Sequence, residues 1–343
     1  MPIFMIGTQR SGSNLLRLML NELPGIAAPH PPHVLQRLMP LVGNYGDLEQ
    51  RENFAQLIED VCRLVELNPV PWEGVTLNRN DIRQRCRAHT LLAVYGAVYA
   101  AMAEAHGART WCCKSLANIR YLPQIEDHFD GSRYIYLYRD GRDVACSFRK
   151  AVVGEKHFYH IAREWAATQQ LALGLRERIG PSRFISISYE SLTGNPELSM
   201  RLLCKFLGMR FRHAMLEFYK SDEAKRAAGS SDLWGNVDKP IMADNTRKFL
   251  REASEEDIRI FESVAGDVLN TLGYERVHVP RGKEMVFSQA NLHWFDAENQ
   301  RLKQETLKRV DAGDLERRDR QESLIQEIRA RGQMAPPAMR AIA

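Results

Sequence analysis

Short apolar runs rich in β-branched and aromatic residues alternate along the chain with longer segments whose apolar positions recur at helical spacing. The runs cover residues 3–6, 110–113, 134–138 and 184–188. Strands buried on both faces of a parallel sheet read as continuous apolar runs, and the crossover between two such strands is usually a helix. The pattern therefore predicts an α/β fold in which a central parallel sheet is flanked by helices in three layers.

The segment between the first two runs is long. It contains two extended helical patterns, at residues 49–67 and 82–106, joined by a loop rich in turn-forming residues. These roughly 100 residues exceed what a single crossover helix requires. We therefore expect a helical cap at about residues 30–108 that forms part of a substrate site.

The last part of the chain is predicted to be helical. Helices are expected at residues 196–207 and 254–272. Residues 296–331 contain 18 charged residues among 36, with few and widely spaced apolar positions. This composition predicts an exposed, charged helical arm, which either contacts a second copy of the chain or is simply solvated. We divide the chain into a main domain at 1–280 and a charged helical extension at 281–343.

The charge balance limits the partners of the protein. The chain has 343 residues, and 47 Lys and Arg against 43 Asp and Glu give a formal net charge of +4. This charge is too small for nucleic-acid binding through bulk electrostatics, so an anion must be held by cations placed locally. The uncharged stretch 88–103 is shorter than the roughly 20 apolar residues of a membrane helix, and no signal-peptide pattern opens the chain. We expect no nucleic-acid partner, no membrane span and a cytoplasmic location.

The cysteines are sparse and lack the paired spacing of a zinc site. They are Cys62, Cys86, Cys112, Cys113, Cys146 and Cys204. Six cysteines in a chain of this length are too few for a disulfide scaffold. We expect reduced thiols in the core and no bound metal.

The first apolar run leads into a glycine-rich turn, Gly7-Thr-Gln-Arg-Ser-Gly-Ser-Asn, and then into a helical pattern. Such a turn aims backbone N–H groups and the positive end of the helix dipole at one point, where phosphate or sulfate binds. Ser13 and Asn14 stand where the ATP-binding Walker A loop has its Lys and its Mg²⁺-binding Ser or Thr. Arg10 inside the turn supplies a cation whose planar donor group suits oxyanions. The turn is therefore predicted to bind an anion other than Mg-ATP.

A second cluster follows the run at 134–138. Arg139 comes at the end of that strand, where open α/β sheets bind their ligands. Asp140 or Gly141 opens a helix, and Ser147 lies about two turns along it, so its hydroxyl can reach the same anion. The alternative is that Arg139 forms a surface ion pair and that Ser147 has no function.

Together, T-Q-R-S-G-S-N at residues 8–14 and Y-R-D-G-R-D-V-A-C-S at 138–147 resemble the two cofactor motifs of sulfotransferases that use 3′-phosphoadenosine 5′-phosphosulfate (PAPS). The resemblance covers roughly residues 3–274 and is strongest to the bacterial and protein-tyrosine sulfotransferase branch. It implies a P-loop-type fold and transfer of a sulfuryl group from PAPS to a hydroxyl or amine, without metal. The desulfated nucleotide PAP would be the product.

The resemblance also implies a set of cofactor-binding residues. In the family, the first motif binds the 5′-phosphosulfate, and the Arg and Ser of the second motif bind the 3′-phosphate. Tyr189 lies in a segment that looks like a later family landmark, and a basic segment containing Arg247 and Lys248 resembles the one that folds over the nucleotide. The implied residues are Arg10, Ser11, Gly12, Ser13, Asn14, Arg139, Ser147, Tyr189, Arg247 and Lys248.

Transfer of a sulfuryl group also needs cations for the charge that develops on the bridging oxygen, and a base for the acceptor hydroxyl. We expect Arg10 and Lys114 to be the cations, because Lys114 follows the run at 110–113 and matches a family lysine, here without the usual proline nearby. Related enzymes place a Glu in the segment Ala28-Pro-His-Pro-Pro-His, which has no carboxylate. His30 and His33 titrate near neutral pH and are the candidate bases. Alternatively, both are loop histidines without a catalytic part.

Two other functions fit parts of the sequence. An ATP-dependent kinase uses a related fold, although the residues at positions 13 and 14 argue against it. A non-catalytic nucleotide-binding scaffold assembled through the C-terminal arm is a second alternative. The acceptor is expected to be a small molecule. Trp72, Tyr95 and Tyr99 in the cap would suit an apolar or aromatic one, and core packing explains these residues equally well.

Overall fold

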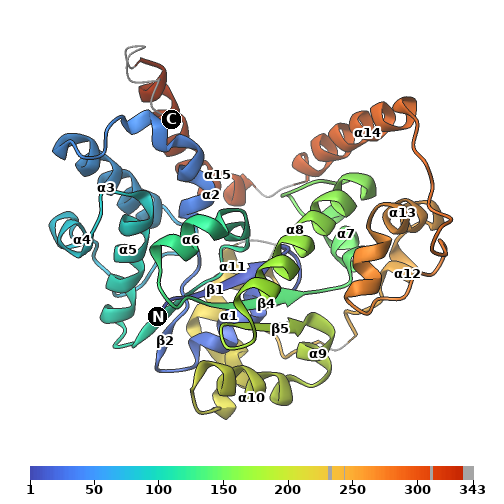
Figure 1. The fold of residues 1–343 in the computed structure, drawn as a ribbon, viewed down its shortest axis with the longest axis horizontal. Helices are drawn as coiled ribbons and strands as arrows, with labels where there is room; N and C mark the ends of the chain where they lie inside the picture. Colours follow the sequence, from blue (N-terminus) through green and yellow to red (C-terminus); the bar gives the residue numbers. More distant parts are fainter. Residues whose placement is uncertain (231–233, 243, 310–311, 335–343) are drawn as a thin grey trace.

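The computed structural model describes residues 1–230, 234–242, 244–309 and 312–334. Within them, five parallel strands form one sheet in the order β2-β3-β1-β4-β5 (Figure 1), which confirms the predicted central parallel sheet. The strands are β1 (Ile3–Gly7), β2 (Ile26–Ala27), β3 (Thr110–Cys113), β4 (Arg133–Tyr138) and β5 (Phe184–Ser188). The pattern of apolar runs missed β2 because two residues are too few to form a run.

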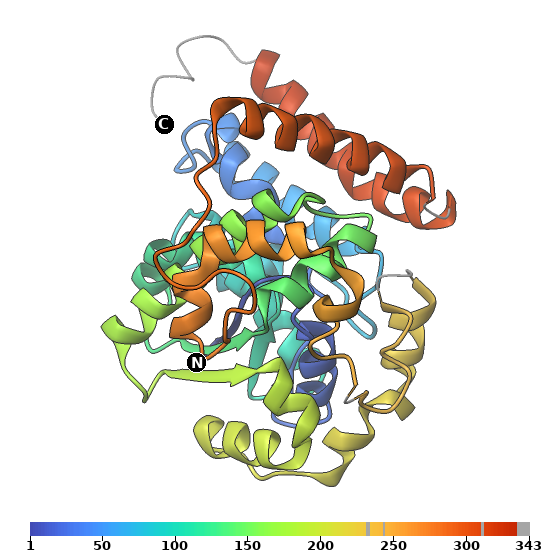
Figure 2. The ribbon, with the colours of Figure 1, turned by 90° about the vertical axis from the view of Figure 1, so that its right-hand side faces the viewer.

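Side chains that alternate along β1 separate the two faces of the sheet. Phe4 and Ile6 belong to a core shared with α3 (Arg51–Glu66), α5 (Leu91–Ala105), α6 and α8. Ile3 and Met5 belong to a core shared with α1, α10 and η3. Helix α11 lies beside α1 (Figure 2). The sheet is therefore the middle of three layers. The flanking helices are α1 (Ser13–Asn21), α6 (Leu122–His128), α7 (Gly141–Lys150), α8 (Phe158–Ile179), α9 (Tyr189–Gly194), α10 (Pro196–Leu207), η3 (His213–Lys220) and α11 (Asp222–Ser230).

The ends of β1 and β4 bring the two predicted anion motifs to one edge of the sheet. The two strands are in register from Ile3 to Gly7, which pairs with Leu137. Gly7 has a φ of 137°, and a Cβ atom there would lie 2.1 Å from the carbonyl oxygen of Leu137. Only glycine fits this position, so the close approach of the two chain segments depends on it.

The cap is built from helices α2 (Val34–Leu38), η1 (Met39–Tyr45), α3 (Arg51–Glu66), α4 (Arg79–Arg85) and α5 (Leu91–Ala105), with η2 (Leu116–Tyr121) following β3. The single helix predicted at 82–106 is wrong, because the chain breaks between α4 and α5. The side chains of Asn78 and Thr90 cap the two helices by accepting hydrogen bonds from backbone N–H groups. Trp72, Tyr95 and Tyr99 are buried in one aromatic cluster with Trp111, so for them the core interpretation holds.

The C-terminal part folds into α12 (Phe249–Glu252), α13 (Glu255–Thr271), α14 (Gln289–Leu307) and α15 (Ala312–Met334). The charged C-terminal helix predicted here is present as α15, but the expectation that all of it is exposed is wrong. Leu324, Ile325 and Ile328 are buried in the same core as α3, and Gln321 Nε2 donates to the backbone oxygen of Leu64 at 2.8 Å. The apolar stripe on α15 is narrow, but the cap covers it. These side chains are therefore not available for contact with a second copy of the chain.

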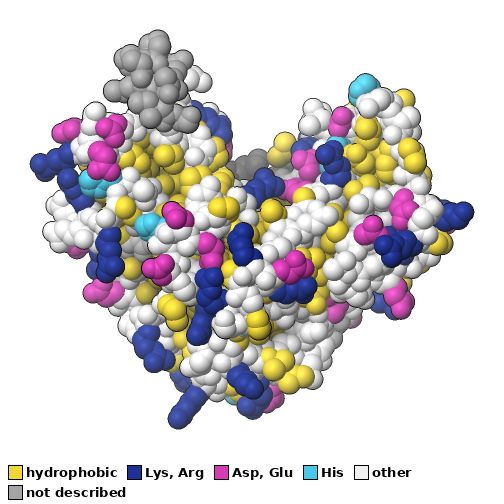
Figure 3. Space-filling model, viewed as in Figure 1, with side chains coloured by type: hydrophobic (Ala, Val, Ile, Leu, Met, Phe, Trp, Pro, Cys, Tyr) yellow, Lys and Arg dark blue, Asp and Glu magenta, His cyan; other side chains and the backbone are white. Residues whose placement is uncertain are grey.

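The face of the molecule in Figure 3 is notched between the end that carries α15 and the end that carries α14. On this face, Lys and Arg side chains are interspersed with Asp and Glu. None of the helices in the described ranges is long and apolar enough to cross a membrane. All six cysteines are free, and all except the half-buried Cys86 are buried.

Candidate active site

The glycine-rich turn between β1 and α1 packs against the side chain of Tyr189. Gly12 has a φ of 84°, and a Cβ atom there would lie 2.5 Å from the ring of Tyr189. Arg10 also has a positive φ, of 70°. Ser11 Oγ and Asn14 Nδ2 are buried and have no hydrogen-bond partner within the described residues. The turn therefore presents polar donors that an anion would satisfy.

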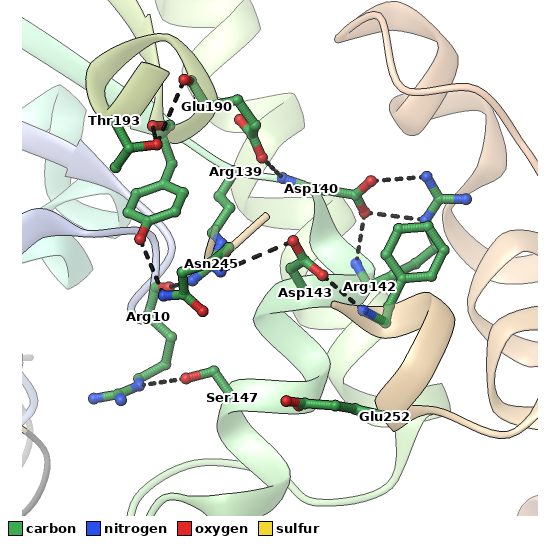
Figure 4. Close-up of polar contacts among 12 residues, drawn as sticks. Arg10, Arg139, Asp140, Arg142, Asp143, Ser147, Glu190, Thr193, Asn245 and Glu252 are labelled. Atoms are coloured by element: carbon green, nitrogen blue, oxygen red, sulfur yellow. Dashed lines mark hydrogen bonds and ion pairs between the residues drawn. The ribbon is translucent and has the colours of Figure 1, made fainter. Parts of the chain in front are cut away.

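The structure brings the two sequence motifs into direct contact (Figure 4). Arg10 Nε donates to Ser147 Oγ at 2.9 Å, and Arg139 Nη1 donates to the backbone oxygen of Arg10 at 3.0 Å. The guanidinium group of Arg139 also stacks on the ring of Tyr189, 4.2 Å from its centre. The Tyr189 ring thus packs against Gly12 of the first motif and Arg139 of the second. The sequence analysis did not assign this positioning role to Tyr189.

A later segment closes over this cluster. Asn245 Nδ2 donates to Tyr189 Oη at 3.0 Å, and its backbone oxygen accepts a hydrogen bond from Arg139. Lys248 is partly buried, and its pKa is lowered by burial and by the charge of Arg139. Arg247, by contrast, is exposed. Of the two basic residues expected here, Lys248 joins the cluster by its charge, whereas Asn245 was not predicted because an asparagine in a polar loop gives no local signal.

Buried positive charge is concentrated around the glycine-rich turn. Burial and the neighbouring Arg139 lower the pKa of Arg10 to about 10. Burial, followed by the charges of Arg17 and Arg10, lowers the pKa of Lys114 to about 7. The carboxylate of Asp143 lies 3.8 Å from Arg139, and burial raises the pKa of Asp143. Cations that disfavour one another's charged form in this way mark a site that an anion would stabilise.

Arg17 is a further buried cation that the sequence analysis missed. It is 0% exposed on α1, donates to Asn14 Oδ1 and to the backbone oxygen of Ala28 at 2.9 Å each, and is ion-paired with Glu223 of α11. Asn21 Oδ1 accepts from the backbone N–H of Ala28 at 2.9 Å. The polar side of α1 therefore anchors the segment that leads to the two histidines. The sequence signal that could have identified Arg17 is a single arginine within the apolar helical pattern of residues 15–19.

The two candidate histidines have different surroundings. His30 is 4% exposed, its Nδ1 lies 3.4 Å from Asn68 Oδ1, and its Nε2 is buried with no partner in the described part of the chain. Burial and the charges of Lys114 and Arg17 lower its pKa well below the usual range. His33 is partly exposed, has a φ of 60°, and its Nδ1 lies 3.2 Å from Ser115 Oγ. His30 therefore has the buried, neutral ring with an available nitrogen.

Lys114 lies at the C-terminal end of β3, as expected, and is 8% exposed. Its pKa responds to Arg10 of the glycine-rich turn, and the pKa of His30 responds to Lys114. Lys114 thus connects the anion cluster with the histidine electrostatically. Across the described ranges, no group of three or more His, Cys, Asp or Glu residues is arranged to hold a metal ion.

Known proteins resemble this chain over most of its length. Protein-tyrosine sulfotransferase A of Caenorhabditis elegans is 24% identical over 284 residues, which are 80% of this chain and 67% of that protein. The protein-tyrosine sulfotransferase of Drosophila melanogaster is also 24% identical, over 286 residues, but these cover 51% of its length. The chain thus spans between half and two thirds of these relatives.

Two solved structures share the fold. The sulfotransferase domain of the Synechococcus PCC 7002 olefin synthase has a TM-score of 0.54 and 22% identity, covering 80% of this chain and 94% of that domain. The sulfotransferase domain from the curacin biosynthetic pathway has the same TM-score and identity, covering 81% and 99%. At family level, residues 2–213 match the sulfotransferase family. This chain therefore belongs to the sulfotransferase family.

Proposed function

We propose that this protein transfers a sulfuryl group from PAPS to a hydroxyl or amine of an acceptor, releasing PAP. The observation that carries the proposal is the contact of Arg10 with Ser147 and Arg139 at the glycine-rich turn. Burial and like charge lower the pKa of Arg10 there, and they also lower the pKa of Lys248 near Arg139. A nucleotide with a 3′-phosphate and a 5′-phosphosulfate supplies several negative charges to such a site. Charge-assisted hydrogen bonds to oxyanions are among the strongest that proteins form.

The residues divide between the two charged ends of the nucleotide. Arg10, Ser11, Gly12, Ser13 and Asn14 would hold the 5′-phosphosulfate, and the unpartnered donors on Ser11 and Asn14 fit that role. Arg139, Ser147 and Lys248 would hold the 3′-phosphate. Tyr189 and Asn245 position these groups through the contacts described above.

The transfer step is assigned to His30 and Lys114. A bond forms between the acceptor oxygen and sulfur while the bond from sulfur to the bridging oxygen breaks, and the bridging oxygen keeps the bonding electrons. His30 Nε2 is assigned to take the proton of the acceptor hydroxyl, because burial and nearby cations lower the pKa of the ring and Nε2 has no other partner in the described residues. Lys114, with Arg10, stabilises the charge that develops on the bridging oxygen. Independence from metal stays a prediction.

The acceptor is proposed to be a small molecule with a hydroxyl or amine. The names of the relatives add tyrosine-containing peptides as acceptors to be tested beside small phenols. Two rivals remain to be distinguished, a kinase that uses ATP and a nucleotide-binding scaffold without catalysis.

A thermal-shift comparison tests the proposal. PAP should raise the melting temperature more than AMP does, with or without EDTA, because Arg139 and Lys248 interact with the 3′-phosphate. Stabilisation by ATP with Mg²⁺ but not by PAP would support the kinase instead. Binding of PAP without turnover of PAPS on any acceptor of a phenol, alcohol and amine panel would favour the scaffold.

A further inference from the structure

Two hydrogen bonds to one backbone oxygen fix the segment that carries His30. Asn68 Nδ2 and Trp72 Nε1 donate to the carbonyl oxygen of His30 at 2.9 and 2.7 Å. A carbonyl oxygen only accepts, so the side-chain amide of Asn68 has one orientation, with its nitrogen toward that oxygen. Its own oxygen then faces the imidazole ring and lies 3.4 Å from His30 Nδ1. Asn68 is itself 4% exposed, which keeps water from competing for these contacts.

This chain of donors and acceptors assigns the proton on the ring. The amide oxygen of Asn68 accepts only, so a hydrogen bond at this contact requires the hydrogen on His30 Nδ1 and leaves Nε2 with its lone pair. His30 Nε2 is buried and has no partner in the described part of the chain. We propose that Asn68 is a positioning residue for sulfuryl transfer: it holds the neutral ring of His30 with the proton on Nδ1, so that Nε2 can accept the proton of the acceptor hydroxyl.

The surroundings of the ring make this control necessary. Lys114 at the end of β3, Arg17 on α1 and His33 on the same segment as His30 all place positive charge or a titratable group toward His30. Together with burial, these groups disfavour the imidazolium form, so the ring is neutral. A neutral ring has two tautomers, and only the one with an unprotonated Nε2 provides a base there. Among the groups near the ring, the oxygen of Asn68 selects between them.

The proposal rests on the proposed function, because it assumes that His30 is the base. In the step concerned, the acceptor oxygen bonds to sulfur, the bridging oxygen leaves with the bonding electrons, and the acceptor proton moves to His30 Nε2. A ring with its proton on Nε2 would block that movement. In the Ser-His-Asp catalytic triad, a variant whose histidine is held in the wrong tautomer is slower by several orders of magnitude.

The test measures the tautomer and the rate separately on the full-length protein with PAP bound. Protonated and unprotonated ring nitrogens give well-separated ¹⁵N resonances, and the signals of His30 are identified by their loss in His30→Ala. In the wild type, the proton should be on Nδ1. In Asn68→Ala, the form protonated on Nε2 should appear, and the single-turnover rate constant with PAPS should fall about tenfold or more while PAP affinity stays within about twofold.

Trp72→Phe is the matched control. It removes the other hydrogen bond to the same carbonyl oxygen but leaves the acceptor at the ring in place. The tautomer should remain that of the wild type, and the rate constant should fall less than it does in Asn68→Ala. A change of tautomer in Trp72→Phe as large as in Asn68→Ala would overturn the proposal, because general loosening of the segment would then explain both variants.

Asn68→Asp provides a second test that holds if the alanine variant does not fold. The carboxylate keeps an acceptor beside Nδ1 and adds a negative charge, which stabilises the imidazolium and raises the pKa of His30. The acid limb of the pH–rate profile should shift to higher pH by about one unit. Lys114, Arg17 and His33 still lower the pKa of His30 in this variant, and the new carboxylate opposes them. A profile that stays in place counts against the proposal.

The outcomes also separate this inference from the proposed function. If Asn68→Ala keeps the proton on Nδ1, the inference is wrong and the proposed function is untouched. If the tautomer changes but the rate constant does not, the inference fails because His30 is not the base. Failure of the wild type to bind PAP would instead overturn the proposed function itself.

Discussion

Two groups of side chains hold their polar atoms in different ways. The nucleotide cluster comprises Arg10, Arg139, Ser147 and Lys248, and the transfer cluster comprises His30 and Lys114. In the first, the guanidinium of Arg139 is fixed by the backbone oxygens of Arg10 and Asn245 and by the ring of Tyr189. In the second, burial and neighbouring cations lower the pKa of Lys114, and His30 Nε2 has no hydrogen-bond partner within the described residues. A guanidinium that several contacts hold in place before the reaction suits ground-state binding. A buried cation with a lowered pKa, and a ring nitrogen without a partner among the described residues, suit a transition state in which charge and protons move.

The largest effect expected from this comparison is on Lys114. Lys114→Met fills similar space without the charge, so the developing negative charge on the bridging oxygen loses its cation. The single-turnover rate constant with PAPS should fall by about 10²- to 10³-fold, equivalent to about 3 kcal/mol or more in the barrier. Affinity for PAP should change much less, because the contacts of Arg139 and Ser147 remain.

Lys220→Met is a suitable control, since Lys220 is exposed and paired with Glu217. It should leave both quantities unchanged. If Lys114→Met weakens PAP binding as strongly as it slows transfer, Lys114 belongs with the binding groups and the division between the two clusters does not hold.

The next effect distinguishes the two histidines. His30→Ala should lower the single-turnover rate constant by about 10²-fold with nearly unchanged PAP affinity, because it removes the proposed base. His33→Ala, three residues away, is the matched control and should have a much smaller effect, since His33 is partly exposed and its Nδ1 lies beside Ser115. A larger loss in His33→Ala would reverse the assignment.

Substitution of Arg139 should affect nucleotide affinity more than the transfer step, the opposite of what is expected for Lys114 and His30. Arg139→Ala removes charge-assisted hydrogen bonds worth about 1.5 to 3 kcal/mol each, so PAP affinity measured by calorimetry should fall at least about tenfold. Arg149 lies on α7, the same helix as Ser147, and both of its terminal nitrogens are paired with Asp257, at 2.8 and 2.9 Å. Arg149→Ala should therefore cost stability but leave PAP affinity unchanged. Equal losses of affinity in both variants would remove Arg139 from the site.

The comparison also shows what sequence patterns reveal. The strands other than β2 and the two anion motifs could be predicted because each is a local pattern: an apolar run, a glycine turn, an arginine at a strand end. The contacts that organise the two clusters are not local. Asn68 reaches His30 across 38 residues, Arg17 reaches Glu223 across 206, and Arg139 reaches Asn245 across 106. Which residues meet over such separations depends on the tertiary fold.

The histidine pair illustrates the same limit. His30 and His33 lie in one proline-rich segment and are chemically identical in the sequence. Burial against the cap and the end of β3 makes one of them neutral and leaves the other partly exposed. Likewise, the sequence of α15 predicts a solvated helix because its apolar side chains are few. Only the tertiary fold shows that the cap buries them.

The smallest expected effect is a pH dependence of nucleotide binding. The pKa of Lys114 is about 7 in the free protein, so near pH 7 about half of the molecules carry the neutral amine. A bound anion favours the charged form and raises this pKa, so binding takes up a proton. At pH 7 the uptake should approach roughly half a proton per PAP bound, and affinity should weaken as the pH rises above 7, whereas below about pH 6 the lysine is already protonated and the dependence should disappear. Calorimetry in two buffers of different ionisation enthalpy measures the uptake directly. Lys114→Met should abolish it, and an undiminished uptake in that variant would assign the proton to another group and weaken the case that Lys114 is poised beside the nucleotide.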